Sequence, residues 1–292
     1  MRDFAAVEAA ISAAIAVRFR VESSRPLGGG CINQAHLLEG CGQRYFLKSN
    51  RAALADMFAA EARGLAELEA AQALRVPHPV ATGSADGASF LVLEYLQLGS
   101  GGDSAALGRQ LARQHRKVAP AFGWDRDNTI GSTPQINVRT DDWPAFLRDR
   151  RLGFQLRLAE QNGLDPKLQD LGAQLLARLG EFFAGYRPAP SLLHGDLWGG
   201  NAAFTTSGEP VVFDPAVYYG DREADLAMTE LFGGFDPRFY AAYREAWPLD
   251  PGYATRKTLY NLYHVLNHAN LFGGGYVGQA ESMLRRLLAE LG

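Results

Sequence analysis

The most informative run of the sequence is His194-Gly195-Asp196-Leu197-Trp198-Gly199-Gly200-Asn201. In it an aspartate follows a histidine by two residues, and an asparagine follows that aspartate by five. A carboxylate in such a loop can orient an attacking hydroxyl and accept its proton, while a nearby amide oxygen can bind a metal ion that screens phosphate charge. Further along, Asp214 ends the apolar run Val211-Val212-Phe213 and can serve as a second metal ligand.

The spacing of Asp196, Asn201 and Asp214 is that of the catalytic loop and the metal-binding aspartate of kinases. The alternative interpretation is a loop in which the aspartate and the asparagine only cap turns. Because both pieces of the pattern occur at matching spacing, the sequence favours the kinase interpretation.

A second, independent indication comes from the helix predicted over residues 52–74. Its apolar stripe, at helical spacing, consists of Leu54, Phe58, Leu65 and Leu68, with Glu61 in the middle. A buried carboxylate needs a cationic partner, and Lys48, one of only four lysines, ends the preceding predicted strand. Kinases use such a Lys–Glu pair to position the α- and β-phosphates of the nucleotide. The alternative is an exposed glutamate and a surface lysine.

Between two strand-like segments lies the run Gly28-Gly29-Gly30-Cys31-Ile32, whose backbone amides can bind phosphates. It is not a Walker A loop, because Gly-Lys-Ser/Thr occurs nowhere in the chain. Taken alone, the run fits an ordinary turn equally well. Its place upstream of Lys48 favours a loop that covers the phosphates.

Glu94, Tyr95 and Leu96 end an apolar strand just before the glycine-rich linker at residues 99–102. This is the position of a kinase hinge, whose backbone offers adenine an alternation of acceptor and donor. An ordinary strand end would look the same in the sequence, so the hinge assignment depends on the flanking motifs.

Composition restricts the class of protein. The 292 residues carry 29 Lys and Arg against 32 Asp and Glu, so no global basic field for nucleic acid is present. The two cysteines form no CxxC motif, which argues against a zinc site and fits a reducing cytoplasm. No apolar run reaches the roughly 18 residues of a membrane span, and Ala5–Val17 fits an amphipathic helix better than an export signal. We expect a cytoplasmic protein without a membrane or nucleic-acid partner.

The pattern of elements predicts an α+β protein. The first third is strand-rich with one long helix, whereas the chain from Ser104 onward is mainly helical, with a loop-rich stretch at residues 119–142. We therefore expect a small nucleotide-covering lobe over residues 1–98 and a larger, mainly helical lobe over residues 99–292.

The chain resembles the fructosamine kinase (ketosamine-3-kinase) family, within the aminoglycoside phosphotransferase and choline kinase-like group. The resemblance rests on Gly28–Ile32, Leu193–Asn201, Phe213–Ala216, Tyr219-Gly220, Glu223, Asp225–Ala227, Phe232–Phe235, Asn128–Asn137, Asp142-Trp143, Phe146, Leu266–His268 and Phe272-Gly273. The catalytic-loop block and the Ile130–Asn137 segment are its most specific parts. At Leu271 this sequence departs from the family, many of whose members carry a second histidine there.

The resemblance implies a two-lobed protein-kinase-like fold and ATP-dependent phosphorylation of the 3-hydroxyl of ketosamines, free or on glycated proteins, leading to deglycation. It implies Asp196 as the catalytic base. Asn201 and Asp214 would hold Mg²⁺, Lys48 would bind the α- and β-phosphates, and Glu61 would orient Lys48.

For the acceptor, we expect Trp198 to border the sugar, because aromatic faces pack against sugars and attract protonated amines. His268 is a second candidate for contact with sugar hydroxyls. The alternatives are a core tryptophan that supports the loop and a structural histidine. Asp225 is expected to brace the catalytic loop rather than to contact substrate.

Two other functions stay open at this point. A kinase of another small hydroxylated amine, such as an aminoglycoside or choline, would share every nucleotide-site residue. A non-catalytic nucleotide-binding regulatory protein is the other alternative, although such proteins commonly lose a residue of the set Lys48, Asp196, Asn201 and Asp214.

Cys31 is also a candidate redox residue. On a phosphate-covering loop, backbone amides and Lys48 would favour its thiolate, which oxidises more readily than a thiol. It could pair with Cys41 or form a disulfide-linked dimer through Cys31 of a second copy. The alternative is a small residue that fills a turn.

Overall fold

In the computed structural model, residues 4–28 and 33–292 are described, and the chain divides into two compact units. The first comprises residues 1–103 and 202–215, and the second comprises residues 104–201 and 216–292. The sequence suggested one division between residues 98 and 99. In the structure, residues 202–215 return to the first unit, where Gly99 N donates to Phe204 O (2.8 Å) and Thr206 N donates to Gln97 O (3.0 Å).

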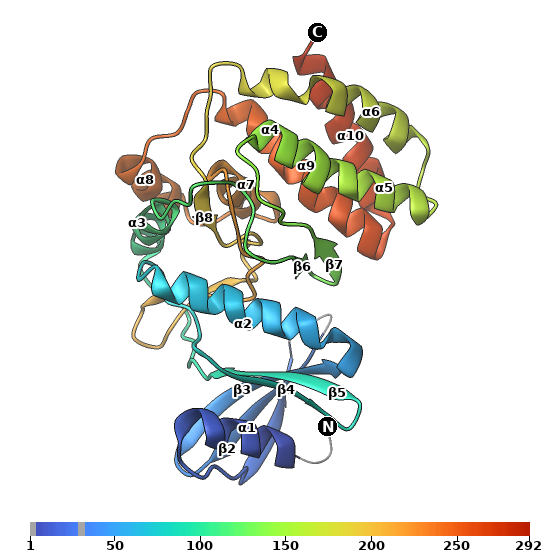
Figure 1. The fold of residues 1–292 in the computed structure, drawn as a ribbon. Helices are drawn as coiled ribbons and strands as arrows, with labels where there is room; N and C mark the ends of the chain where they lie inside the picture. Colours follow the sequence, from blue (N-terminus) through green and yellow to red (C-terminus); the bar gives the residue numbers. More distant parts are fainter. Residues whose placement is uncertain (1–3, 29–32) are drawn as a thin grey trace. The chain divides into compact units, whose positions relative to one another are not determined.

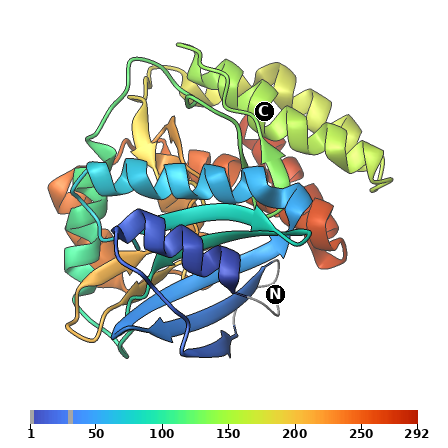
Figure 2. The same cartoon turned by 60° about the horizontal axis from the view of Figure 1, so that its bottom comes forward.

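The first unit contains a five-stranded antiparallel sheet and two helices (Figure 1). The strands lie in the order β1 (Ser23–Leu27), β2 (Gln34–Gly40), β3 (Gln43–Arg51), β5 (Ala88–Glu94) and β4 (Pro79–Ala85). The helices are α1 (Ala5–Ile15) and α2 (Ala55–Ala70), and the short helix η1 (Ala52–Leu54) precedes α2. Figure 1 shows the sheet between α1 and α2, and Figure 2 shows α1 lying across the strands.

Side chains that alternate along β3 place Leu47 on one face of the sheet and Lys48 on the other. Leu47 is fully buried in a core cluster with Val7 and Ile11 of α1. Because successive side chains of a strand point to opposite faces, Lys48 lies on the other face, against which α2 packs. The strand therefore places one lysine among the side chains of the long helix.

The second segment of the first unit is a short hairpin of β9 (Ala202–Phe204) and β10 (Pro210–Val212). Val212 N donates to Arg75 O (3.0 Å), which joins the hairpin to the chain beyond α2. Asp214 follows β10 by two residues, so this join fixes where its carboxylate lies.

The second unit is mainly helical, as the sequence predicts from Ser104 onward. Its helices are α3 (Ser104–His115), α4 (Trp143–Phe146), α5 (Gly153–Gln161), α6 (Lys167–Arg178), α7 (Glu223–Leu231), α8 (Pro237–Ala246), α9 (Tyr253–Phe272) and α10 (Gly275–Glu290). A π-helical turn (Leu147–Leu152) and a 3-10 turn (Leu179–Phe183) complete the helical part. Two short antiparallel pairs complete the unit: β6 (Asn128–Ile130) pairs with β7 (Thr133–Gln135), and β8 (Ser191–Leu193) pairs with β11 (Tyr218–Gly220). No helix among the described residues combines the length and the apolar character that crossing a membrane requires.

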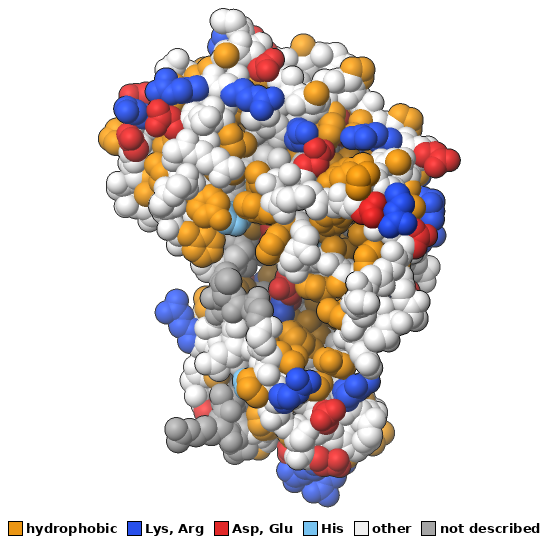
Figure 3. Space-filling view, turned by 180° about the vertical axis from the view of Figure 1, so that it is seen from behind, with side chains coloured by type: hydrophobic (Ala, Val, Ile, Leu, Met, Phe, Trp, Pro, Cys, Tyr) orange, Lys and Arg blue, Asp and Glu red, His pale blue; other side chains and the backbone are white. Residues whose placement is uncertain are grey.

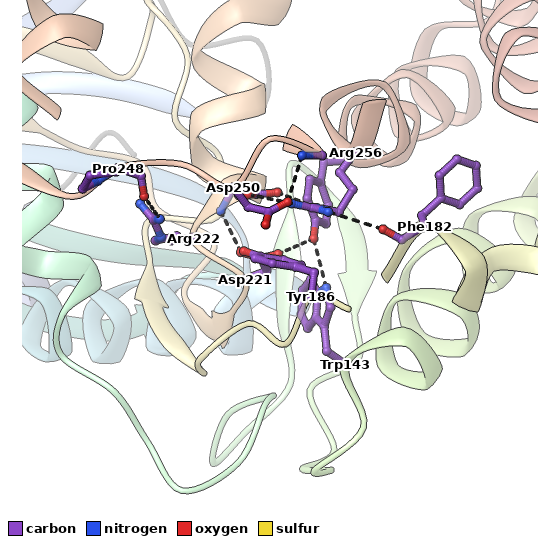
Figure 4. Close-up of polar contacts among 11 residues, drawn as sticks. Trp143, Phe182, Tyr186, Asp221, Arg222, Pro248, Asp250 and Arg256 are labelled. Carbon is purple, nitrogen blue, oxygen red and sulfur yellow. Dashed lines mark hydrogen bonds and ion pairs between the residues drawn. The ribbon is translucent and has the colours of Figure 1, made fainter. Parts of the chain in front are cut away.

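A buried polar network ties α9 to the start of α7 (Figure 4). Asp221 accepts hydrogen bonds from the hydroxyls of Tyr260 (2.5 Å) and Tyr186 (3.0 Å). Trp143 Nε1 donates to the Tyr260 hydroxyl (3.1 Å), and the Arg256 guanidinium lies 3.7 Å from the centre of the Tyr186 ring. Burial raises the pKa of Asp221. The network fixes the backbone that leads from β11 into α7.

The helix α9 also carries a buried histidine that should make stability depend on pH. Burial, followed by the nearby His268, lowers the pKa of His264 from 6.5 to about 3, and its Nδ1 atom has no hydrogen-bond partner among the described residues. The unfolded chain therefore binds a proton between pH 6.5 and 3 that the folded chain does not. Above pH 6.5 His264 is neutral in both states and does not change the free energy of unfolding with pH. As the pH falls below 6.5, protonation of the unfolded chain lowers the free energy of unfolding.

We predict that His264→Gln flattens the acid dependence of unfolding. Lowering the pH to 5 should cost the wild type about 2 kcal/mol through His264 alone, at about 1.4 kcal/mol per pH unit. Urea unfolding of both proteins at pH 7.5, 6 and 5 measures the difference. Parallel pH dependences in the two proteins would show that His264 does not cause the effect.

Candidate active site

The first unit brings together three of the residues singled out from the sequence. Lys48 Nζ donates to Glu61 Oε1 at 2.6 Å and also forms an ion pair with Asp214. Glu61 lies on α2 between Phe58 and Leu65, both fully buried. The helical stripe thus places the carboxylate where β3 places the lysine.

One cation between two carboxylates leaves this cluster with a net negative charge. Burial acts to lower the pKa of Lys48, but the charges of Glu61 and Asp214 outweigh burial and raise that pKa above its ordinary value. Lys48 is 6% exposed, whereas the Asp214 side chain is 49% exposed. A divalent cation at Asp214 would neutralise this excess negative charge.

The second unit holds the catalytic loop between β8 and residue 201. The backbone amides of His194 and Gly195 donate to the two oxygens of Asp225 at 2.7 and 2.8 Å. Asn201 Nδ2 donates to the Asp196 carbonyl (2.9 Å) and to Asp196 Oδ2 (3.2 Å). The Asp196 carboxylate is therefore held by the amide of Asn201, and the loop that carries it is held by Asp225, the bracing role expected for that residue.

A histidine that the sequence did not single out supports the same brace. His115 Nε2, from the end of α3, lies 3.1 Å from Asp225 Oδ2, and both side chains are buried. Burial alone would raise the pKa of Asp225, but the hydrogen bond and charge of His115, with further contributions from the charge of His194 and the Gly195 amide, hold it below its usual value. Asp225 thus stays ionised and can accept all three hydrogen bonds.

The segment from Asn128 to Asn137 forms a buried bracket. Asn128 Nδ2 donates to Val217 O (2.8 Å), and Gln135 Nε2 donates to Ala216 O (3.1 Å) and to Asn128 Oδ1 (2.9 Å). Ala216 N in turn donates to His194 O at 2.9 Å. This bracket, the side chains of Asn128, Gln135 and Asn137, therefore fixes the backbone next to the catalytic loop.

A fully buried arginine supports the bracket. Arg151 donates to Ile136 O and to Asn137 Oδ1, both at 2.7 Å, and its guanidinium lies 4.2 Å from the centre of the Tyr218 ring. Sequence reasoning missed Arg151 because no local spacing marks a cation whose partners are carbonyl oxygens and rings.

The oxygen donors suit magnesium. With its Nδ2 atom engaged, Asn201 keeps Oδ1 as an acceptor, and Asp214 offers a half-exposed carboxylate. No group of three or more His, Cys, Asp or Glu among the described residues could hold a metal ion by itself. By chemical type, each of these two oxygens suits Mg²⁺, which retains waters and takes phosphate oxygens as further ligands.

Of the other residues predicted for the nucleotide site, the structure describes the hinge but only the first residue of the glycine run. Gly28 follows β1 directly, whereas Gly29, Gly30, Cys31 and Ile32 lie outside the described residues. At the predicted hinge, Glu94 N donates to His78 O (2.9 Å), and the Glu94 side chain is paired with Arg75. Tyr95 and Leu96 follow β5 directly.

The two acceptor-site candidates are linked through a third ring. The Trp198 side chain is 38% exposed and meets Phe232 edge-on, with 6.0 Å between ring centres. Phe232 lies 5.0 Å from His268, whose Nδ1 donates to His264 O at 2.8 Å. The sequence analysis named Phe232 only as part of the family resemblance and gave it no role.

We predict that Asp225→Asn destabilises the protein and lowers turnover. An amide offers one acceptor oxygen, so one of the two loop N–H groups would face a second donor, at a cost of about 1–3 kcal/mol. Turnover should fall at least tenfold, because the loop that carries Asp196 shifts. Thermal unfolding and steady-state kinetics measure the two effects.

The matched control is Asp236→Asn, at the exposed N-cap of α8, where Asp236 Oδ1 accepts from Arg238 N at 2.8 Å. Asparagine caps helices about as well as aspartate, so this variant should behave as the wild type. Equal stability and turnover in both variants would remove Asp225 from its bracing role.

Comparison with known proteins gives a consistent result. The family model described as fructosamine kinase matches residues 3–290. A Synechocystis sp. protein assigned as a ketoamine kinase is 50% identical over 276 residues, which cover 92% of each chain. The chloroplastic protein-ribulosamine 3-kinase of Oryza sativa subsp. japonica is 45% identical over 262 residues, covering 88% of this chain and 76% of the relative.

Solved structures agree on the fold. A Haemophilus somnus protein assigned as a fructosamine-3-kinase superposes with a TM-score of 0.89 at 30% identity, covering 97% of this chain and 96% of the other. The choline kinase LicA of Streptococcus pneumoniae superposes with a TM-score of 0.65 at 16% identity, covering 98% of each chain, and shows the fold alone. The fold is the protein-kinase-like one, with a strand-rich first unit and a mainly helical second unit.

Proposed function

This chain belongs to the fructosamine kinase family, and from that premise we propose that it transfers the γ-phosphoryl group of ATP to the 3-hydroxyl of ketosamines. The observation that carries the proposal is the catalytic loop, in which Asn201 holds the Asp196 carboxylate and Asp225 holds the backbone. The likeness to choline kinase and to aminoglycoside phosphotransferases is below 25% identity and supports only the shared fold.

The retained side chains argue against a non-catalytic protein. Lys48, Glu61 and Asp214 form one ion-pair cluster, and Asp196 and Asn201 are hydrogen-bonded to each other. A protein that only binds nucleotide has no need of a carboxylate held for the acceptor hydroxyl.

The chain's own residues position the reactants and balance charge. Asp196 accepts a hydrogen bond from the acceptor hydroxyl and aligns it with the γ-phosphorus. It takes the hydroxyl proton as the new O–P bond forms and the bond from the γ-phosphorus to the β–γ bridging oxygen breaks, which releases ADP. Lys48 binds the α- and β-phosphates and is kept charged and oriented by Glu61. Asn201 and Asp214 are the residues that would hold Mg²⁺, which supplies neutralisation of phosphate charge when bound.

The product chemistry leads to deglycation. Loss of a proton from C1 of the 3-phosphorylated ketosamine gives an enamine, and the C3–O bond then breaks to expel phosphate. Water hydrolyses the resulting imine and releases the amine. No further catalyst is required for this sequence, so the kinase step commits the adduct to removal.

The acceptor and the compartment follow from the same reasoning. The rice relative is named for protein-bound ribulosamine, and we include ribulosamines, free or on proteins, among the acceptors of this chain. We place the enzyme in the cytoplasm, because its two cysteines form no CxxC motif and Cys41, which is exposed, has no disulfide partner among the described residues. The dimer through Cys31, and its redox switch, stay predictions because Cys31 lies outside the described residues.

The proposal is tested by ADP release with Mg-ATP against ketosamines, an aminoglycoside and choline. We expect turnover only with ketosamines, and a phosphate at the 3-hydroxyl by NMR. Turnover of choline or the aminoglycoside at a higher kcat/KM than any ketosamine would replace the proposed acceptor class.

We predict that Asp196→Asn abolishes turnover while ATP affinity stays within a few-fold of the wild type. The carboxylate acts on the acceptor hydroxyl rather than on the nucleotide. Asp214→Ala provides the contrast, since it should weaken Mg-ATP binding as well as turnover. Loss of nucleotide binding in a folded Asp196→Asn protein would contradict the role given to Asp196.

A further inference from the structure

Five aromatic side chains of the second unit form one connected surface. They are Trp198, Phe232, His268, Phe272 and Tyr276, hereafter the aromatic surface. Ring centres are 6.0 Å apart from Trp198 to Phe232, 5.0 Å from Phe232 to His268 and 5.6 Å from His268 to Phe272. Tyr276 contacts both His268 (5.1 Å) and Phe272 (6.4 Å). The rings thus continue from the catalytic loop to the junction of α9 and α10.

The aromatic surface is not part of the hydrophobic core. Trp198 and Phe272 are 38% and 58% exposed, and of all described Trp and Phe side chains only these two are exposed. In Figure 3, hydrophobic side chains gather beside a histidine on the face of the second unit that is shown. Exposed rings contribute little to folding, and a cluster of them usually marks a binding site.

The backbone turn that holds these rings is specialised. Gly273 (φ 63°, ψ −139°) ends α9 and Gly274 (φ 60°, ψ −137°) begins α10. Residues with a side chain avoid this region of backbone conformation. The two glycines turn the chain so that Tyr276 packs against Phe272 and His268, although Phe272 itself remains more than half exposed.

The chemistry of the aromatic surface suits an organic cation with an apolar substituent. Ring faces attract cations and pack against apolar groups. His268 uses Nδ1 to donate to the His264 carbonyl (2.8 Å), which leaves Nε2 as an acceptor for an N–H group. A ketosamine carries a secondary amine that is protonated at neutral pH, next to whatever group the amine bore before glycation.

We propose that the aromatic surface binds the amine side of the ketosamine and favours apolar or aromatic substituents on the nitrogen. The inference rests on the proposed function, which places the sugar hydroxyl at Asp196, two residues before Trp198. Beyond Trp198, three ring-to-ring contacts of 6.0, 5.0 and 5.6 Å lead through Phe232 and His268 to Phe272. With the sugar at Asp196 and Trp198, we assign the contact with Phe272, at the other end of this series of rings, to the substituent on nitrogen.

The test compares ketosamines that share one sugar and differ in the amine, namely methylamine, butylamine and benzylamine. For the wild type we expect kcat/KM to rise along this series, with benzylamine about five- to tenfold above methylamine, mostly through KM. In Phe272→Ala the ratio of benzylamine to methylamine should fall to near one. Phe272→Tyr keeps the ring and should restore the ratio.

The matched control is Val138→Ala, because Val138 is exposed to a similar extent (55%) in the same unit but belongs to no ring contact of the aromatic surface. It should preserve the wild-type ratio. If the wild type phosphorylates no ketosamine, the proposed function fails. If it phosphorylates them with equal kcat/KM along the series, or if Phe272→Ala retains the preference, the proposed function stands and the role of the aromatic surface is overturned.

Discussion

The carboxylate of Asp225 accepts hydrogen bonds from two successive backbone amides, those of His194 and Gly195, and the catalytic loop depends on this contact. The same turn requires a glycine, because Gly195 has a φ of +85° and a Cβ there would lie 2.0 Å from Ala216 O. His115 supplies the buried acid with a third donor. The whole arrangement fixes Asp196 before any substrate arrives, which is how phosphoryl transfer gains most of its rate.

The features that could be predicted from the sequence lie within one structural element or between two adjacent ones. The spacing from His194 to Asn201 encodes one loop, and the helical stripe around Glu61 together with alternation in β3 is enough to bring that carboxylate to Lys48. The strand-rich first third and the helical remainder were predicted for the same reason, since periodicity reports on neighbours a few residues apart. Each of these predictions needed only one element or two adjacent ones.

What escaped prediction depends on contacts between distant segments. His115 and Asp225 are 110 residues apart, and no periodic pattern connects them. The return of residues 202–215 to the first unit rests on backbone hydrogen bonds to residues 97 and 99, which leave no mark on the sequence. Arginines usually lie on the surface, yet Arg151 is fully buried. Its partners are carbonyl oxygens and aromatic rings rather than a carboxylate, so no acidic residue in the sequence indicates that it is buried.

The bracket changes how the most specific part of the sequence is interpreted. Asn128, Gln135 and Asn137 are 9%, 1% and 1% exposed, and they bind backbone groups and one another. Buried amides are costly unless their hydrogen bonds are satisfied, so these residues must fit the backbone at Ala216 and Val217 rather than a ligand. The segment therefore supports the catalytic loop, and the acceptor contacts that we propose lie elsewhere in the second unit, on the aromatic surface that includes the exposed Trp198 and Phe272.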